Sequence, residues 1–259
     1  MFHFLAEALR DFRHTGSVWP SSPILAKAMT SSIGAVSGPR RVLEVGPGTG
    51  PFTKAILKKL RAGDRFELVE INQNFCRKLE KDLLTDFRAR HPNVDVRLHC
   101  APIEEAQLSG PFDVIVCGLP FNNFPPKLMR QIFRRMFALL KEDGELVYFE
   151  YAGVRVIKGS VMDRDGRARL KRIDTIGKSM QRKHEGKQEL VLGNFPPAIT
   201  YRLKGLPTDA LLRAEALGRA RKAKVKLKGV KSKGAKGATV AKTSKVGRAG
   251  KTTTESRAR

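Results

Sequence analysis

The chain has 259 residues, which is enough for one domain of about 200 residues and an extension. Its 50 Lys and Arg residues outnumber its 25 Asp and Glu residues and give a net charge of +25, so we expect an anionic partner, either a membrane surface or a nucleic acid. No apolar run reaches the roughly 18 residues of a membrane-spanning helix, and the N-terminus lacks the pattern of a signal peptide. The three cysteines, Cys76, Cys100 and Cys117, have no C-x-x-C spacing, so we expect a reducing compartment and no metal site.

Two amphipathic helices are predicted at the start of the chain, over residues 1–14 and 23–30. The first favours two interpretations: a helix that caps the domain, or an interfacial helix whose aromatic side chains enter lipid headgroups. Residues 15–22 are either a linker or a loop that closes over a ligand at the glycine-rich turn that follows. Residues 1–30 are therefore the candidates for membrane contact and for an active-site lid.

Strand and helix patterns alternate over residues 31–206, which predicts an α/β domain with a mostly parallel sheet and helices on both faces. The last two strands follow each other closely, so we expect an antiparallel edge at the C-terminal end of a seven-stranded sheet. The predicted strands are 41–45, 65–69, 94–99, 112–117, 145–151, 154–158 and 199–203. The predicted helices are 52–61, 73–89, 103–107, 126–140 and 170–183.

A glycine-rich turn between the first predicted strand and its helix indicates a nucleotide-like ligand. Its three glycines alternate with other residues: Gly46, Gly48 and Gly50. Glu44 lies inside the strand, and Glu70 ends the next strand, where an acid can bind ribose hydroxyls. No Lys-Ser or Lys-Thr follows the glycines, which excludes a P-loop. S-adenosylmethionine carries a ribose and a cationic amine but no phosphate, so it fits two acids better than NAD does.

A second motif, residues 118–123, follows the fourth predicted strand at the same edge of the sheet. Gly118 and Pro120 favour a tight loop, and Phe121 and Asn122 are predicted to face the methyl group that is transferred. An amine acceptor must be neutral to attack, and an apolar pocket favours its deprotonated form. Phe121, Phe124 and Tyr151 are the candidates for that lining, although core packing is the more frequent role of aromatic residues.

The composition changes after residue 206. A short helix is predicted over residues 207–218, and residues 219–259 hold fifteen Lys or Arg and one acid, Glu255. Without an aromatic residue this tail cannot build a core, so we expect it to be disordered. It is either a solubilising extension or an electrostatic attachment to anionic lipid, and it could also bind nucleic-acid phosphates.

Five segments together resemble one family: HTGSVWPSSPILAKAM, VLEVGPGTGPFT, the acid in LVEIN, GLPFNNFP and NFPPAITY. They resemble the bacterial soluble phospholipid N-methyltransferases, which are Rossmann-like class I enzymes related to the rRNA adenine dimethylases. The resemblance covers about residues 1–206. It implies S-adenosylmethionine as cofactor and methylation of the headgroup amine of phosphatidylethanolamine toward phosphatidylcholine, by a cytoplasmic enzyme bound peripherally to the inner face of the membrane.

The resemblance also implies roles for individual residues. Glu44 and the three glycines would hold the methionine part of the cofactor, Glu70 the ribose and Ile71 the adenine. Such enzymes often place an acid near the adenine amine after the third strand; this chain departs from that pattern, and the backbone of Ala101 or the nearby Glu104 would take its place. Residues 118–121, which include Gly118 and Leu119, would flank the reacting methyl group. With the candidates from the residues themselves, we predict Phe121, Asn122 and Tyr151 as the catalytic residues.

Three alternatives stay open. The acceptor could be another amino lipid, such as ornithine lipid, or an adenine of rRNA. The rRNA enzymes carry an Asn at the position of Gly118, which makes the RNA alternative the weaker one. The third alternative is a non-catalytic basic binding protein on the same scaffold. The glycines and Glu70 argue against it, because a protein that binds no cofactor needs neither.

Overall fold

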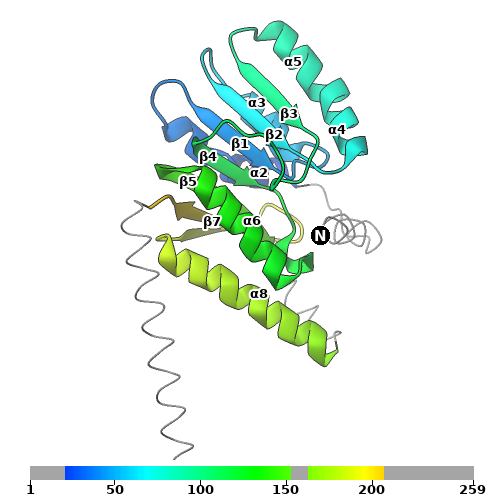
Figure 1. Cartoon of the computed structure of the whole chain (residues 1–259), viewed down its shortest axis with the longest axis vertical. Helices are drawn as coiled ribbons and strands as arrows, with labels where there is room; N and C mark the ends of the chain where they lie inside the picture. Colours follow the sequence, from blue (N-terminus) through cyan, green and yellow to red (C-terminus); the bar gives the residue numbers. More distant parts are fainter. Residues whose placement is uncertain (1–20, 153–162, 207–259) are drawn as a thin grey trace, which may run out of the picture. The chain divides into compact units, whose positions relative to one another are not determined.

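A seven-stranded sheet organises the computed structural model of the chain, which describes residues 21–152 and 163–206 (Figure 1). The strands lie in the order β3-β2-β1-β4-β5-β7-β6. Only β7 runs antiparallel to its neighbours, β5 and β6, so the predicted α/β fold and its antiparallel C-terminal edge are confirmed. The strands are β1 (Arg41–Val45), β2 (Arg65–Val69), β3 (Asp95–His99), β4 (Phe112–Cys117), β5 (Leu140–Tyr151), β6 (Lys187–Val191) and β7 (Ala198–Lys204).

The edge of the sheet differs from the sequence prediction. The strand predicted at residues 154–158 lies outside the described residues, and the seventh strand is β6. Four of the five β6 residues are exposed, because β6 is the last strand of the sheet and little covers it. An exposed edge strand lacks the apolar alternation that sequence reasoning needs.

Helices cover both faces of the sheet. One core cluster lies beneath α6 and α8, and a second lies beneath α2 and α3. No helix in the described part of the chain is long and apolar enough to cross a bilayer. The helices are α2 (Pro23–Met29), η1 (Ser31–Ala35), α3 (Pro51–Leu57), α4 (Gln73–Leu79), η2 (Glu80–Leu84), α5 (Thr85–Arg90), η3 (Phe121–Asn123), α6 (Pro126–Leu139) and α8 (Arg164–Lys183).

Two helix predictions need correction. The helix predicted at 103–107 is wrong: the amides of Glu105 and Ala106 both donate to the Pro102 carbonyl at 3.0 Å, and the chain makes a single turn there. A segment this short forms too few hydrogen bonds to offset helix nucleation. The helix predicted at 73–89 is interrupted by η2, one π-helical turn between α4 and α5.

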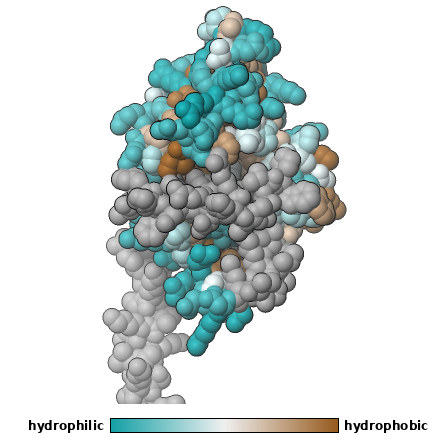
Figure 2. Space-filling model, turned by 90° about the vertical axis from the view of Figure 1, so that its right-hand side faces the viewer, coloured by the Kyte–Doolittle hydropathy of each residue, from teal (hydrophilic) through white to brown (hydrophobic). Residues whose placement is uncertain are grey.

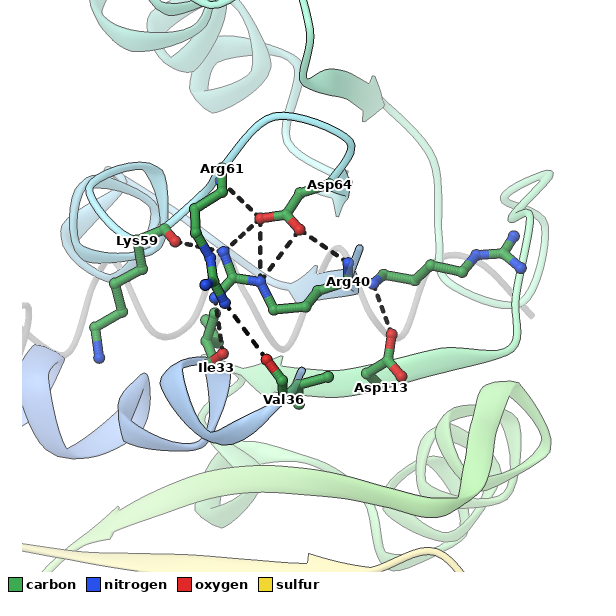
Figure 3. Close-up of polar contacts among 8 residues, drawn as sticks. Ile33, Val36, Arg40, Lys59, Arg61, Asp64 and Asp113 are labelled. Carbon is green, nitrogen blue, oxygen red and sulfur yellow. Dashed lines mark hydrogen bonds and ion pairs between the residues drawn. The ribbon is translucent and has the colours of Figure 1, made fainter. Parts of the chain in front are cut away.

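A buried ion pair joins the elements at the amino end of the sheet (Figure 3). The Arg40 guanidinium, which is 2% exposed, bonds the Asp64 carboxylate and donates to the carbonyls of Ile33 (2.9 Å) and Lys59 (2.5 Å). Burial by itself would raise the pKa of Asp64, but hydrogen bonds from Arg40 and Arg61 outweigh it and lower that pKa. The pair therefore ties η1, the end of α3 and the turn before β2 to one point.

The parallel register decides which residues meet at the opposite, carboxyl edge. Val45 of β1 pairs with Val69 of β2 and with Cys117 of β4. The residues that follow these three, Gly46, Glu70 and Gly118, therefore leave the sheet side by side.

Candidate functional site

The side chain of Glu44 lies beneath the glycine turn and is completely buried. Its Oε2 accepts a hydrogen bond of 2.7 Å from the Thr53 hydroxyl, and its Oε1 has no hydrogen-bond partner among the described residues. Burial raises the pKa of Glu44 to about 8; the bond from Thr53 opposes this shift, and the charge of Glu70 adds to it. A buried acceptor oxygen of this kind favours a cationic or hydrogen-bond-donating ligand group.

Glu70 holds the glycine turn from the side of β2. Its two carboxylate oxygens accept backbone hydrogen bonds from Gly48 (3.0 Å) and Asn72 (2.8 Å), and the residue is 5% exposed. This places a carboxylate at the end of β2 beside the glycine turn, where an acid binds the ribose hydroxyls of a nucleotide-like ligand.

The glycine turn and the β4 loop are packed too closely for side chains at two positions. A Cβ on Gly46, where φ is +70°, would lie 2.4 Å from Leu119 Cδ2, and a Cβ on Gly118 would lie 2.6 Å from the Gly46 carbonyl oxygen. Gly48 is different: its φ is +58°, but no atom lies within 4 Å of an added Cβ. The backbone at Gly48 is therefore open to a ligand, while Gly46 and Gly118 lock the two loops together.

The other residues predicted to bind the cofactor lie around this turn. Gly50 begins α3 as its N-cap, with φ at +85°. Ile71 and Ala101 are partly buried and pack against the core cluster that contains Leu119. The structure thus brings the polar and glycine residues into direct contact and places the two adenine candidates against the neighbouring core.

The three residues predicted to act on the substrate occupy different environments. Phe121 is 1% exposed, and its ring stacks on Phe133 at a centroid distance of 4.8 Å, so the ring contributes to the core. Asn122 is half-buried in the short helix η3. Tyr151 is half-buried at the carboxyl end of β5; burial raises the pKa of its phenol, and a hydrogen bond with the Ser21 side chain partly offsets that rise.

Sequence reasoning missed two residues of the site, Thr53 and Ser21. Thr53 lies in the first turn of α3, and no sequence pattern indicates that its hydroxyl turns back to a strand nine positions earlier. Ser21 reaches Tyr151 across 130 residues of the chain, which only the tertiary structure reveals. In the described ranges, no group of three His, Cys, Asp or Glu side chains could hold a metal ion.

The residues present fit S-adenosylmethionine. Glu44 has a buried oxygen without a hydrogen-bond partner among the described residues, Glu70 places a carboxylate beside the turn, and Gly48 leaves the backbone accessible. A methionine ammonium matches the first feature and ribose hydroxyls the second, and the open backbone gives the cofactor room to approach.

Comparisons with known proteins agree with this fit. The family model described as "Methyltransferase domain" matches residues 42–144. The ornithine lipid N-methyltransferase of Singulisphaera acidiphila is 31% identical over 148 residues, which are 55% of this chain and 73% of that protein.

Solved structures show the same fold. Cofactor-bound Rv0187 from MTB superposes with a TM-score of 0.55 at 16% identity, over 78% of this chain and 90% of that one. An O-methyltransferase from Bacillus cereus, solved in complex with SAH, has a TM-score of 0.52 at 17% identity, over 78% of this chain and 91% of that one.

Proposed function

The chain belongs to the S-adenosylmethionine-dependent class I methyltransferases, and from this we propose that it methylates the primary amine in the headgroup of a membrane amino lipid. The observation that carries the lipid assignment is the 31% sequence identity with an ornithine lipid N-methyltransferase, in an alignment that covers 73% of that enzyme. Phosphatidylethanolamine, methylated toward phosphatidylcholine, is the substrate that the sequence motifs favour. Ornithine lipid is the second candidate, which the named relative favours.

Several residues of the carboxyl edge would hold the cofactor. The unpartnered oxygen of Glu44 would receive the methionine ammonium, Glu70 the ribose hydroxyls, and the open backbone at Gly48 would lie against the ligand. S-adenosylmethionine supplies an electrophilic methyl group on a sulfonium. The protein's part is to position the amine in line with that group and to exclude water.

The amine must reach the site without its proton. An aliphatic ammonium has a pKa of roughly 10.4, and an apolar environment lowers it. Tyr151 keeps its proton at neutral pH because burial raises its pKa, so we assign it a hydrogen-bonding role and no role as a phenolate base. Asn122, which is half-buried, is the remaining predicted polar contact for the amine.

We further propose that the enzyme works in the cytoplasm at the inner face of the membrane. The net charge of +25 supports attraction to anionic lipid. The two segments predicted to bind lipid, residues 1–14 and 219–259, lie outside the described residues.

The test is incubation of the full chain with methyl-labelled S-adenosylmethionine and one of three acceptors: phosphatidylethanolamine vesicles, ornithine-lipid vesicles or ribosomal RNA. We expect label in lipid, and the two vesicle preparations decide between the substrates. Label in RNA alone would overturn the proposal.

A single substitution tests the assignment of Glu70 to the cofactor ribose. Glu70→Ala should abolish binding of S-adenosylmethionine in calorimetry, because the ribose loses its acceptor and the turn loses the bond to Gly48. Affinity equal to that of the parent would contradict the assignment of Glu70 to the ribose.

A further inference from the structure

Four large apolar side chains are exposed in the described part of the chain. On the face seen in Figure 2, the residues that are not grey are mostly hydrophilic, with a few hydrophobic patches between them. Ile24 lies at the start of α2, Leu190 in β6, and Leu192 and Phe195 in the turn between β6 and β7. Their exposed fractions are 56% for Ile24, 56% for Leu190, 73% for Leu192 and 71% for Phe195. Exposed apolar groups that gather in one place mark an interaction site.

Hydrogen bonds hold the β6–β7 turn against α2. Asn194 is 3% exposed; its Oδ1 accepts from the Ser22 amide at 2.8 Å, and its Nδ2 donates to the Pro196 carbonyl at 2.7 Å. Gly193 lies so close to Ile24 that an added Cβ would be 2.3 Å from Ile24 Cδ1. Leu192 and Phe195 are therefore held on a fixed turn, residues 192–195, which we call the apolar turn. Ile24 of α2 lies directly beside it.

The strand directions place the apolar turn at the edge of the sheet that carries the candidate site. Both β5 and β6 are antiparallel to β7, so β6 runs in the direction of β5 and of the other parallel strands. The turn after β6 therefore leaves the sheet at the carboxyl edge, as the glycine turn after β1 does.

A groove lined by lysines lies beside this surface, between α2 and α3. Its volume is about 520 Å³, and it is lined at one end by Thr49 and Pro51 of the glycine turn. Four lysines line it, and the described lining residues include no acid: Lys27, Lys54, Lys58 and Lys59. Asp82 acts electrostatically on Lys54, but it is ion-paired with Lys78.

The lysines of the groove are poorly compensated. The pKa of Lys59 is lowered by burial and then by the charges of Lys27 and Arg40, and its Nζ donates to the Thr30 carbonyl at 2.8 Å. The four lysines surround one groove whose described lining residues include no acid, and positive charges gathered in this way favour an anion in their midst. A lipid phosphate has that charge, and a lipid bilayer is the partner that offers phosphates beside an apolar layer.

We propose that the folded domain docks on an anionic lipid bilayer through the apolar turn and Ile24, which enter the interfacial region, while the lysines of the α2–α3 groove contact lipid phosphates. This inference rests on the proposed function. It adds a bilayer contact on the folded domain to those expected of residues 1–14 and 219–259, and it turns the face that carries α2 and α3 toward the lipid, with the glycine turn at one end of that face.

Tryptophan fluorescence tests insertion directly. The full chain has one tryptophan, Trp19, so Phe195→Trp in a Trp19→Phe background reports on the apolar turn alone. With vesicles of phosphatidylglycerol and phosphatidylcholine we expect a blue shift and quenching by brominated acyl chains. Lys171→Trp in the same background, at an exposed position of α8, is the control and should show neither. Vesicle binding without a change at position 195 would overturn the proposal.

Removing lysine charges from the groove tests whether it contacts lipid phosphates. Lys54→Gln with Lys58→Gln should weaken partition onto these vesicles at low salt by about fivefold for each lysine. Lys171→Gln with Arg172→Gln removes the same charge from α8 and should have a smaller effect. Equal losses in the two double variants would show that net charge alone matters and would overturn the assignment to the groove. The assignment would also be overturned if the Lys54 and Lys58 double variant lost binding to RNA and kept its binding to vesicles.

These vesicles contain no amino lipid, so the docking test does not depend on methyl transfer. Insertion without methylation of any amino lipid would contradict only the proposed function. Methylation of lipid in the separate amino-lipid vesicles, without insertion at position 195, would contradict only the docking surface.

Discussion

At the scale of single residues, Glu44 has a protonation state that depends strongly on the fold. Its pKa in the folded chain is about 8, against 4.5 for an ordinary glutamate, because it is buried. Below pH 4.5 the folded and unfolded states are both protonated. Between pH 4.5 and 8 the unfolded state releases the proton and the folded state keeps it, so stability falls as the pH rises.

Glu44→Gln is therefore expected to raise the free energy of unfolding at pH 8, by on the order of 4 kcal/mol, and to change it little at pH 4.5. Urea unfolding at the two pH values measures the difference. The same variant should lose affinity for S-adenosylmethionine, because glutamate can release its proton when the ammonium binds and the amide cannot. A variant that keeps the parent's pH dependence would contradict the assigned pKa.

Some glycines are required by close packing and others are not, and alanine substitution distinguishes the two kinds. Gly118→Ala should lower the free energy of unfolding by about 1–3 kcal/mol, because its Cβ would lie 2.6 Å from the backbone oxygen of Gly46. Gly34→Ala is the control, since nothing lies within 4 Å of an added Cβ there. Thermal unfolding of both variants checks this, and equal melting temperatures would contradict the close packing of the two loops.

At the scale of elements, the Arg40–Asp64 pair is the strongest polar link between α3, η1 and the sheet. Arg40→Met leaves the Asp64 carboxylate buried and unpaired, which should cost about 3–5 kcal/mol of unfolding free energy. Arg40→Met with Asp64→Leu should recover most of that loss, because no buried charge remains.

Denaturant unfolding of the single and double variants measures this coupling. The exposed pair Lys78–Asp82 is the control, and breaking it should cost less than about 1 kcal/mol. If the Arg40 variant were as stable as the control variant, the pair would not be the link that we describe.

Elements that pair inside the sheet were predictable, and those at its edge were not. β1, β2 and β4 are mostly apolar and almost wholly buried because both of their faces are covered, and their bounds match the prediction. β6 is exposed on four of five residues, so its sequence has no strand pattern, and its place is fixed by pairing with β7.

For the whole molecule, charge is the property that the sequence supplies directly. Deleting residues 219–259 removes fifteen basic residues and should lower binding to anionic vesicles, most clearly at low salt, while leaving cofactor affinity unchanged. Vesicle co-sedimentation and calorimetry measure the two properties. Unchanged vesicle binding at low salt would favour the solubilising role of the tail.

The sequence alone determined the fold class, the cofactor and the residues of the glycine turn, because those depend on local features: apolar strands, alternating glycines and an acid at a strand end. The tertiary structure decided how these residues act. Only the parallel register brings Gly46 against Gly118, only burial raises the pKa of Glu44, and only packing turns the ring of Phe121 into the core. The catalytic role of Phe121, Asn122 and Tyr151 stays a prediction. Side-chain burial and contacts between distant segments arise from the folded chain as a whole, so no local pattern encodes them.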